Sequence, residues 1–258
     1  MKLRLCRLIC GKALPFRTGL VVVRGYAPQS DTGRAPSLKS ELSVRQSLTA
    51  HQAAKPRITD HDDLSRIRDN LTLRIIAGKY RGRRLKSPPS LETRPTSDRL
   101  RETLFNILAP RIKGARFLDL CAGSGAVGIE ALSRGAAYAT FVDQSRPMCA
   151  LIETNLESLR LDEDDREVVV AEALEFLRPR VKQGSDPFDF VFFDPPYAAD
   201  YAVVLDYLGE HMEDLLVKDG VVIVEHYRKN DLQADFGKLR RHRELKQGDS
   251  CLSFYQAT

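Results

Sequence analysis

Short apolar runs alternate with amphipathic stretches between residues 116 and 224. Short apolar runs predict buried strands, and apolar residues at the spacing of a helical turn predict helices. The predicted strands cover residues 116–120, 139–142, 167–170, 188–193 and 221–224, and the predicted helices cover 126–134, 146–159, 173–182 and 202–216. Strands that alternate with helices favour an α/β fold with a doubly wound, mostly parallel sheet.

Further elements are predicted on both sides of this alternation. Residues 238–245 and 251–256 flank a Gly-Asp turn and predict a C-terminal antiparallel hairpin, which brings the sheet to seven strands. Residues 73–85 predict a small β-hairpin around a glycine-containing turn. A helix with one apolar face follows, with Thr96 or Ser97 as its predicted N-cap.

The chain divides into three predicted parts. Residues 1–72 lack sustained apolar periodicity and predict a basic, disordered extension. Residues 73–115 supply the hairpin and helix, and residues 116–258 supply the α/β core. The first 30 residues carry Lys and Arg but no acid, which is typical of an organellar transit peptide and also of an RNA-contacting arm. We expect a cytoplasmic protein, with organellar targeting by residues 1–30 as the alternative.

Charge is distributed unevenly along the chain. Residues 74–116 contain 12 Lys and Arg against 3 Asp and Glu, whereas residues 117–258 contain 15 against 26. Dense arginine on a short folded stretch is typical of proteins that bind a phosphate backbone. The alternative is a solvated basic face that balances an acidic body.

Composition excludes several other classes. No apolar run approaches the ~20 residues that a membrane span needs, so no membrane partner is expected. The 5 Cys and 5 His show no paired spacing, which argues against both a disulfide scaffold and a metal site.

A glycine-rich turn follows the first predicted strand of the core. Gly123, Gly125 and Gly128 satisfy G-x-G-x-x-G, a pattern typical of backbone that approaches a ligand closely. Asp119 precedes these glycines, where a carboxylate can pair with a cationic amino group and would repel a pyrophosphate. Asp143 ends the next predicted strand and suits ribose hydroxyls. The pattern therefore favours S-adenosylmethionine over a nicotinamide dinucleotide.

Two further residues extend this candidate cofactor site. Glu172 and Ala173 end the third predicted strand, where they can contact an adenine ring. The alternatives are an exposed helix-capping acid for Glu172 and a loop-capping carboxylate for Asp119. The candidate cofactor-binding residues are Asp119, Ala122, Gly123, Ser124, Gly125, Asp143, Glu172 and Ala173.

The tetrapeptide Asp194-Pro195-Pro196-Tyr197 follows the apolar strand 188–193. Two consecutive prolines remove backbone donors and fix the turn. The Asp194 carboxylate and the Pro195 carbonyl can then accept both N–H groups of an exocyclic amine, while Tyr197 stacks on the base. Two converging acceptors stabilise positive charge on the nitrogen, so these four residues are the candidate catalytic residues. The alternative is a Pro-Pro turn that only caps a strand.

These motifs together resemble class I methyltransferases that modify exocyclic or amide nitrogens. More narrowly, the chain is similar to the RsmD family over residues 74–256, through its motifs at 74–85, 94–106, 128–135 and 248–255. That family methylates N2 of a guanine in bacterial small-subunit (16S) ribosomal RNA. The resemblance implies a Rossmann-like class I methyltransferase fold, S-adenosylmethionine as cofactor and an assembling 30S particle as partner. We expect a monomer.

The resemblance also implies that the basic hairpin and the start of the helix after it help to hold RNA near the cofactor cleft. The candidate RNA-binding residues are Lys79, Arg81, Arg83, Arg84, Arg94, Arg99 and Arg101.

Several other functions remain open at this point. An adenine-N6 methyltransferase acting on DNA or RNA would use residues 194–197 equally well, and a glutamine-amide methyltransferase would leave the arginines without a role. A NAD-dependent oxidoreductase would explain the glycine loop and Asp143 but not residues 194–197. A non-catalytic RNA-binding assembly factor could keep the same fold.

Overall fold

The computed structural model describes residues 73–88, 96–196 and 200–257, all of which belong to the unit Ile58–Thr258. The predicted extension 1–72 and the candidate residues Arg94 and Tyr197 lie outside the described residues. The predicted division of the folded part between residues 115 and 116 stays a prediction.

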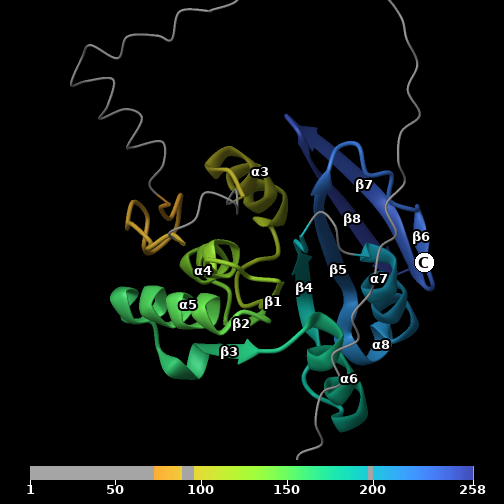
Figure 1. The fold of residues 1–258 in the computed structure, drawn as a ribbon, viewed down its shortest axis with the longest axis horizontal. Helices are drawn as coiled ribbons and strands as arrows, with labels where there is room; N and C mark the ends of the chain where they lie inside the picture. Colours follow the sequence, from red (N-terminus) through yellow and green to blue (C-terminus); the bar gives the residue numbers. More distant parts are fainter. Residues whose placement is uncertain (1–72, 89–95, 197–199, 258) are drawn as a thin grey trace, which may run out of the picture. The chain divides into compact units, whose positions relative to one another are not determined.

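One mixed sheet forms the centre of this unit (Figure 1). Its strands are β1 (Arg116–Leu120), β2 (Tyr138–Asp143), β3 (Arg166–Val170), β4 (Phe188–Phe193), β5 (Leu216–Tyr227), β6 (Asp235–Phe236), β7 (Leu239–Gln247) and β8 (Ser250–Ala257). They lie in the order β3-β2-β1-β4-β5-β8-β7-β6, with β1–β5 parallel and the other pairs antiparallel. The predicted fold class is confirmed, and the sheet has an eighth strand because the two-residue β6 pairs with β7.

One helix, α3, precedes β1, and the other helices connect the parallel strands. The helices are α3 (Asp98–Leu108), α4 (Ala126–Ser133), α5 (Arg146–Leu159), α6 (Ala173–Gln183), α7 (Tyr201–Glu210) and α8 (Met212–Leu215), with a short 3₁₀ turn η1 (Glu163–Asp165) before β3. The single helix predicted over 202–216 is wrong, because His211 leaves helical geometry at φ −113° and Leu216 already pairs with Phe188 in the sheet. Ser97 rather than Thr96 caps α3, since its side chain accepts from the Leu100 N–H. None of the helices in the described ranges is both long and apolar enough to cross a membrane.

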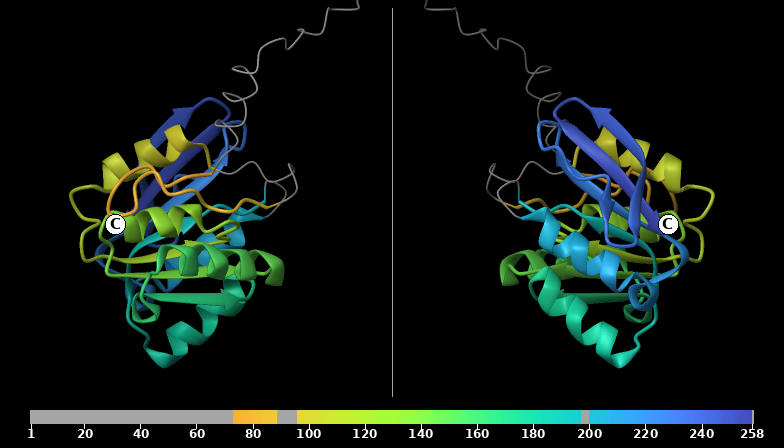
Figure 2. Two further views of the ribbon diagram at one scale, coloured as in Figure 1. Left: turned by 90° about the vertical axis from the view of Figure 1, so that its left-hand side faces the viewer. Right: turned by 90° about the vertical axis from the view of Figure 1, so that its right-hand side faces the viewer.

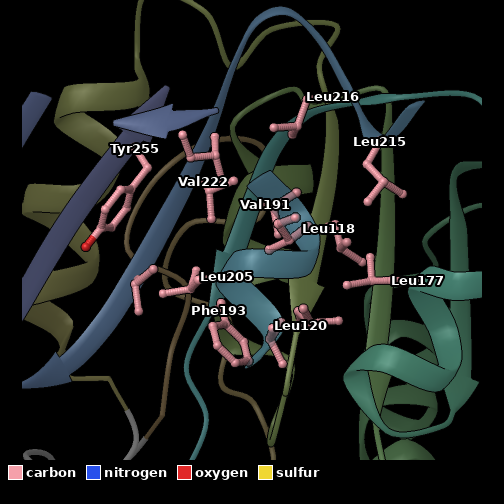
Figure 3. Packing of buried hydrophobic residues seen from close by; sticks show 14 of the residues in the cluster. Leu118, Leu120, Leu177, Val191, Phe193, Leu205, Leu215, Leu216, Val222 and Tyr255 are labelled. Atoms are coloured by element: carbon pink, nitrogen blue, oxygen red, sulfur yellow. The ribbon is translucent and has the colours of Figure 1, made fainter. Parts of the chain in front are cut away.

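Alternate residues of a strand point to opposite faces of the sheet, and both faces are covered by apolar side chains. On one face, α6, α7 and α8 pack against a cluster that includes Leu118, Val191 and Val222 (Figure 3). On the other face, α3 and α4 pack against Phe117, Phe192 and neighbouring residues of β5 and β8. Helices on both faces explain why the inner strands are apolar at nearly every position.

The segment 73–86 packs beside α4 (Figures 1 and 2). The β-hairpin predicted over 73–85 is only partly formed, since the two arms share one isolated bridge between Arg74 and Arg84. Backbone hydrogen bonds from Ile75 to Arg83 and from Leu85 to Leu73 keep the arms antiparallel. Several other backbone groups of the turn bond to α4 instead of to each other, which prevents a regular two-stranded ladder.

Two polar residues of α4 hold this segment. The fully buried Glu130 carboxylate accepts the N–H groups of Ile76 (2.8 Å) and Ala77 (3.0 Å) and also the Nε–H of Arg134 (2.7 Å). Ser133 accepts the backbone N–H of Lys79 through its carbonyl at 2.7 Å. Residues 73–86, the basic segment, are therefore fixed to α4, the helix that follows the glycine loop.

We predict that Glu130→Ala releases the basic segment. The substitution leaves two backbone N–H groups and the Arg134 guanidinium without their buried acceptor, so the free energy of unfolding should fall by about 3 kcal/mol. Chemical denaturation measures this loss, and hydrogen exchange should show reduced protection at Ile76 and Ala77. Glu102→Ala, an exposed acid on α3, is the control and should change stability by less than about 0.5 kcal/mol. Unchanged protection at Ile76 and Ala77 would contradict the proposed anchoring.

Candidate active site at the carboxyl ends of the parallel strands

Acidic residues occupy or follow the carboxyl ends of four parallel strands. Asp119 lies near the end of β1, Asp143 ends β2, Asp194 follows β4, and Glu225 lies in the last part of β5. β1 lies between β2 and β4, so the chain turns outward in both directions from this point of the sheet. In open α/β sheets, ligands bind at such a switch point outside the carboxyl ends of the strands.

Asp119 is buried, with 1% of its surface exposed, and one carboxylate oxygen accepts the Gly128 N–H at 2.8 Å. The pKa of Asp119 is raised to about 7, chiefly by burial; the hydrogen bond from Gly128 opposes this rise and the nearby Asp143 carboxylate adds to it. The carboxylate therefore holds the first turn of α4, which is the loop-capping alternative, and retains a second oxygen that can accept from other partners.

The glycine loop runs from Cys121 to Gly125 between β1 and α4. The N–H groups of Cys121 and Ala122 both donate to the Val142 carbonyl at 2.9 Å, which ties the loop to β2. Gly125 is the N-cap of α4 at φ +74°, a left-handed conformation that a glycine adopts without strain. A Cβ on Gly123 would meet no heavy atom within 4 Å, so there is open space directly beside this backbone.

Side chains from β2 and α5 support the loop. Asp143 accepts the Gly123 N–H and the Ser145 N–H, both at 2.8 Å, so each of its oxygens already holds backbone. Asn155 is buried and bridges two segments: its side chain pairs with both the N–H and the carbonyl of Lys86 and donates to the Ser124 carbonyl at 3.3 Å. One amide thus joins the end of the basic segment to the glycine loop.

Glu172 has a structural role at the start of α6. It is exposed and forms a capping box, in which its side chain accepts from the backbone of Glu175 and the Glu175 side chain accepts the Glu172 N–H. This matches the helix-capping alternative, and a contact from Glu172 or Ala173 to a cofactor stays a prediction.

Asp194 and the two prolines extend from β4 toward β1. The Asp194 N–H donates to the Leu120 carbonyl at 3.3 Å, which places this backbone next to the end of β1. Pro195 is buried, and Pro196 is exposed. Burial raises the pKa of Asp194 well above its usual range, and the negative charges of Glu225 and Asp119 raise it further.

The acids make this edge of the sheet electronegative. The Cys121 thiol reports this field, because burial and then the charges of Asp143, Asp194 and Asp119 raise its pKa to about 12. Buried carboxyl groups with raised pKa values are stabilised in their charged form by a cation. The site therefore favours a positively charged ligand over a pyrophosphate.

Sequence reasoning missed Glu225 and Asn155. Glu225 had a signal, because it directly follows the predicted apolar strand 221–224 in the same way that Asp194 follows 188–193. Asn155 had none, since a single amide on a predicted helix does not reveal which loops it joins.

The candidate RNA-binding residues separate into two groups. Lys79, Arg81, Arg83, Arg84 and Arg99 are exposed. Arg101 contradicts the prediction: it is fully buried, and its guanidinium donates to Asp98 and to the Arg74 carbonyl, both at 2.8 Å. Because Arg101 lies on the apolar face of α3 and joins that helix to the basic segment, it cannot contact RNA on the surface.

One trio of possible metal ligands occurs in the described part of the chain. Single ligand atoms of His226, Glu244 and Cys251 lie within 4.8 Å of one another. Glu244 also pairs with Lys246 at 2.9 Å and with Arg241 at 3.5 Å, so two cations already neutralise its charge. The trio is therefore a poor cation site, and the expectation that no metal binds stays a prediction.

Known proteins are similar to this chain in sequence and in fold. The family model described as "Conserved hypothetical protein 95" matches residues 73–256. Ribosomal RNA small subunit methyltransferase D of Escherichia coli (strain K12) is 39% identical over 186 residues, which cover 71% of this chain and 89% of that protein. A solved structure of a hypothetical protein from Thermus thermophilus is 33% identical with a TM-score of 0.60 and covers 71% of this chain and 99% of its own.

A more distant structure shares the fold alone. SMU.776, solved as a complex with SAH, is 16% identical with a TM-score of 0.52, over 61% of this chain and 49% of its own. The family match and the relative from E. coli confirm the predicted resemblance. The chain belongs to the conserved hypothetical protein 95 family, the family of ribosomal RNA small subunit methyltransferase D (RsmD).

Proposed function

We propose that the protein is a methyltransferase that moves a methyl group from S-adenosylmethionine to the exocyclic N2 of a guanine in small-subunit ribosomal RNA. The observation that carries this proposal is the position of Asp194-Pro195-Pro196 next to the start of the glycine loop, since the Asp194 N–H donates to the carbonyl of Leu120, the residue before that loop. Membership of a family that includes an rRNA small subunit methyltransferase supports the substrate class.

The charges at the site fit S-adenosylmethionine. Its ammonium and sulfonium groups are cationic, and the acids that surround the glycine loop gain most from cations because they are buried. Asp119 would bind the amino group of the cofactor, and Asp143 would bind its ribose. The open space beside Gly123 would let the cofactor approach the backbone closely. A nicotinamide dinucleotide would bring its pyrophosphate against the same acids.

When bound, S-adenosylmethionine supplies a methyl group on a positively charged sulfur. The chain then has to orient a weakly nucleophilic aromatic amine and stabilise the positive charge that develops on its nitrogen. The Asp194 carboxylate and the Pro195 carbonyl would each accept a hydrogen bond from one of the two N–H groups of that amine. Asp194 would also receive the proton that the nitrogen loses after methyl transfer. Holding the amine in line accounts for the remainder of the catalysis by orientation.

The basic segment would hold the RNA. It carries exposed Lys79, Arg81, Arg83 and Arg84 on backbone that Glu130 and Ser133 fix to α4. Its last residues reach the glycine loop through Asn155, so RNA phosphates bound here would lie on the same side of the molecule as the cofactor. An assembling 30S particle is the partner that we propose.

Product analysis tests the proposal. Wild-type protein is incubated with labelled S-adenosylmethionine and, separately, unmethylated small subunits, naked 16S rRNA and duplex DNA, followed by nucleoside digestion and mass spectrometry. We expect N2-methylguanosine from the small subunit. N6-methyladenine in any substrate would mean that the protein transfers methyl groups to adenine rather than to guanine. Cofactor binding without any product would favour a non-catalytic RNA-binding factor.

Asp194→Asn should abolish methyl transfer while leaving cofactor binding nearly unchanged. An amide cannot accept a proton or stabilise a cation as a carboxylate does, so the single-turnover rate should fall by at least about 100-fold. Asp206→Asn, an exposed acid on α7, is the matched control and should keep the wild-type rate. A tenfold loss of cofactor affinity with an unchanged rate would instead place Asp194 in the cofactor site.

Asp119 should make cofactor binding depend on pH. Since its pKa is raised to about 7, the carboxyl is protonated at lower pH and charged at higher pH. Affinity for S-adenosylmethionine should therefore be about tenfold weaker at pH 6 than at pH 8. Calorimetry across this range measures the effect, and Asp119→Asn should remove the pH dependence. Binding that is equally tight at both pH values would leave Asp119 with only its loop-capping role.

Removing charge from the basic segment should weaken RNA binding in a salt-dependent way. The triple variant Lys79→Gln, Arg81→Gln, Arg83→Gln should reduce the slope of log K against log salt by about 2 to 3. The control Arg178→Gln, Lys182→Gln, Lys218→Gln removes the same exposed charge elsewhere and should leave the slope unchanged. Equal effects of both triples would mean that net charge, not this segment, attracts the RNA.

A further inference from the structure

Glu225 is a buried acid next to the Asp194 turn that the proposed chemistry leaves without a role. Only 5% of its surface is exposed. It lies on β5, two residues before Tyr227, where the strand and its pairing with β8 end. Burying a carboxyl group is costly unless other groups compensate for its charge. Thr96 provides one such group, since its hydroxyl donates to Glu225 Oε2 at 2.8 Å.

The sheet brings the Glu225 and Asp194 side chains to the same face. Phe193 of β4 is paired in register with Val224 of β5, so Asp194 and Glu225 are the next positions along two adjacent parallel strands. Alternate residues share a face, and Phe192 and Ile223, the residues two positions earlier, belong to one cluster with α3. The two carboxyl groups therefore lie side by side on the face of the sheet that α3 covers, on strands that are about 4.8 Å apart.

The electrostatics agree with this geometry. The negative charge of Glu225 is the largest charge effect on Asp194, second only to burial in raising the pKa of Asp194. Asp119 on β1 adds to it, and the thiol of Cys121 lies in the same field. A neighbouring negative charge disfavours the charged form of a carboxyl group, and hydrogen-bond donors from a ligand favour it.

Guanine supplies such a pair of donors. Its N1–H and N2–H groups are adjacent on one edge of the base, whereas the corresponding edge of adenine presents the N1 lone pair beside the N6 amine. Resting on the proposed function, we propose that Glu225 is a specificity-determining residue that accepts the N1–H of the substrate guanine while Asp194 accepts an N2–H. A carboxylate at this position rejects adenine because it faces the N1 lone pair.

The test uses 2-aminopurine, which keeps the 2-amino group of guanine but has a lone pair at N1. Small subunits are reconstituted with ligated 16S rRNA that carries either guanine or 2-aminopurine at the position mapped by product analysis. Wild-type protein should methylate the 2-aminopurine subunit about 10- to 100-fold more slowly, because one good hydrogen-bond pair is lost and two acceptors oppose each other. Equal rates on both subunits overturn the proposal, and this measurement needs no variant.

Glu225→Gln should weaken the preference. The amide oxygen can still accept from Thr96, which leaves the N–H₂ group to donate to N1 of 2-aminopurine. We expect the guanine preference of this variant to fall to within about threefold, whereas Glu213→Gln, an exposed partner of Lys238 on α8, should keep the wild-type ratio. A folded Glu225→Gln protein with the wild-type ratio overturns the proposal.

The pH profile separates this role from a purely structural one. Asp194 has to be charged to accept N–H, so the single-turnover rate falls as pH falls through its raised pKa. Removing the charge of Glu225 lowers that pKa, so the acid limb of the Glu225→Gln profile should shift to lower pH. An unshifted limb means that Glu225 does not act on Asp194 and overturns the proposal. Absence of N2-methylguanosine from wild-type reactions on unsubstituted subunits is the separate failure of the proposed function.

Discussion

The burial of like charges at one edge of a parallel sheet is the constraint on which the site depends. Three of these acids also hold a piece of backbone or a neighbouring segment: Asp119 holds the first turn of α4, Asp143 holds the glycine loop, and Glu225 holds Thr96 before α3. These bonds keep the carboxyl groups in place despite their mutual repulsion. The result is a fixed set of acceptors whose charged forms become more stable when a cation or hydrogen-bond donors arrive.

The basic segment complements this acidic edge without neutralising it. Its lysine and arginine side chains are exposed, while its backbone bonds to Glu130 and Ser133 of α4. Backbone hydrogen bonds to α4 hold much of the segment, and the side chains of Arg74 and Arg83 add bonds to Asp98 and to the Ser158 carbonyl. The buried guanidinium of Arg101 joins the segment to α3 through the Arg74 carbonyl. Positive and negative surfaces thus remain distinct on neighbouring elements.

Much of the fold could be predicted because its strands are buried on both faces and therefore apolar throughout. β1 and β4 have the bounds expected from their apolar runs, and α5 has the bounds expected from its periodicity. Predictions failed where tertiary bonds decide the conformation: His211 interrupts a continuous helical pattern, and α4 takes backbone bonds of the expected 73–85 hairpin. In the candidate site, acids at strand ends could be located from spacing. The burial of Arg101 could not, because it depends on which face of α3 meets the sheet, and neither the charge of this residue nor the family resemblance indicates that face.

The single amide of Asn155 gives the molecule a short mechanical link between two backbone segments. It holds the N–H and carbonyl of Lys86 on one side and the carbonyl of Ser124 on the other. The positions of these segments are therefore interdependent, and any free energy that ordering one of them contributes to the other acts equally in the opposite direction. A polynucleotide that fixes residue 86 and a small molecule that fixes residue 124 would bind as thermodynamically linked ligands, with the sign of the linkage set by whether both favour the same orientation of this amide.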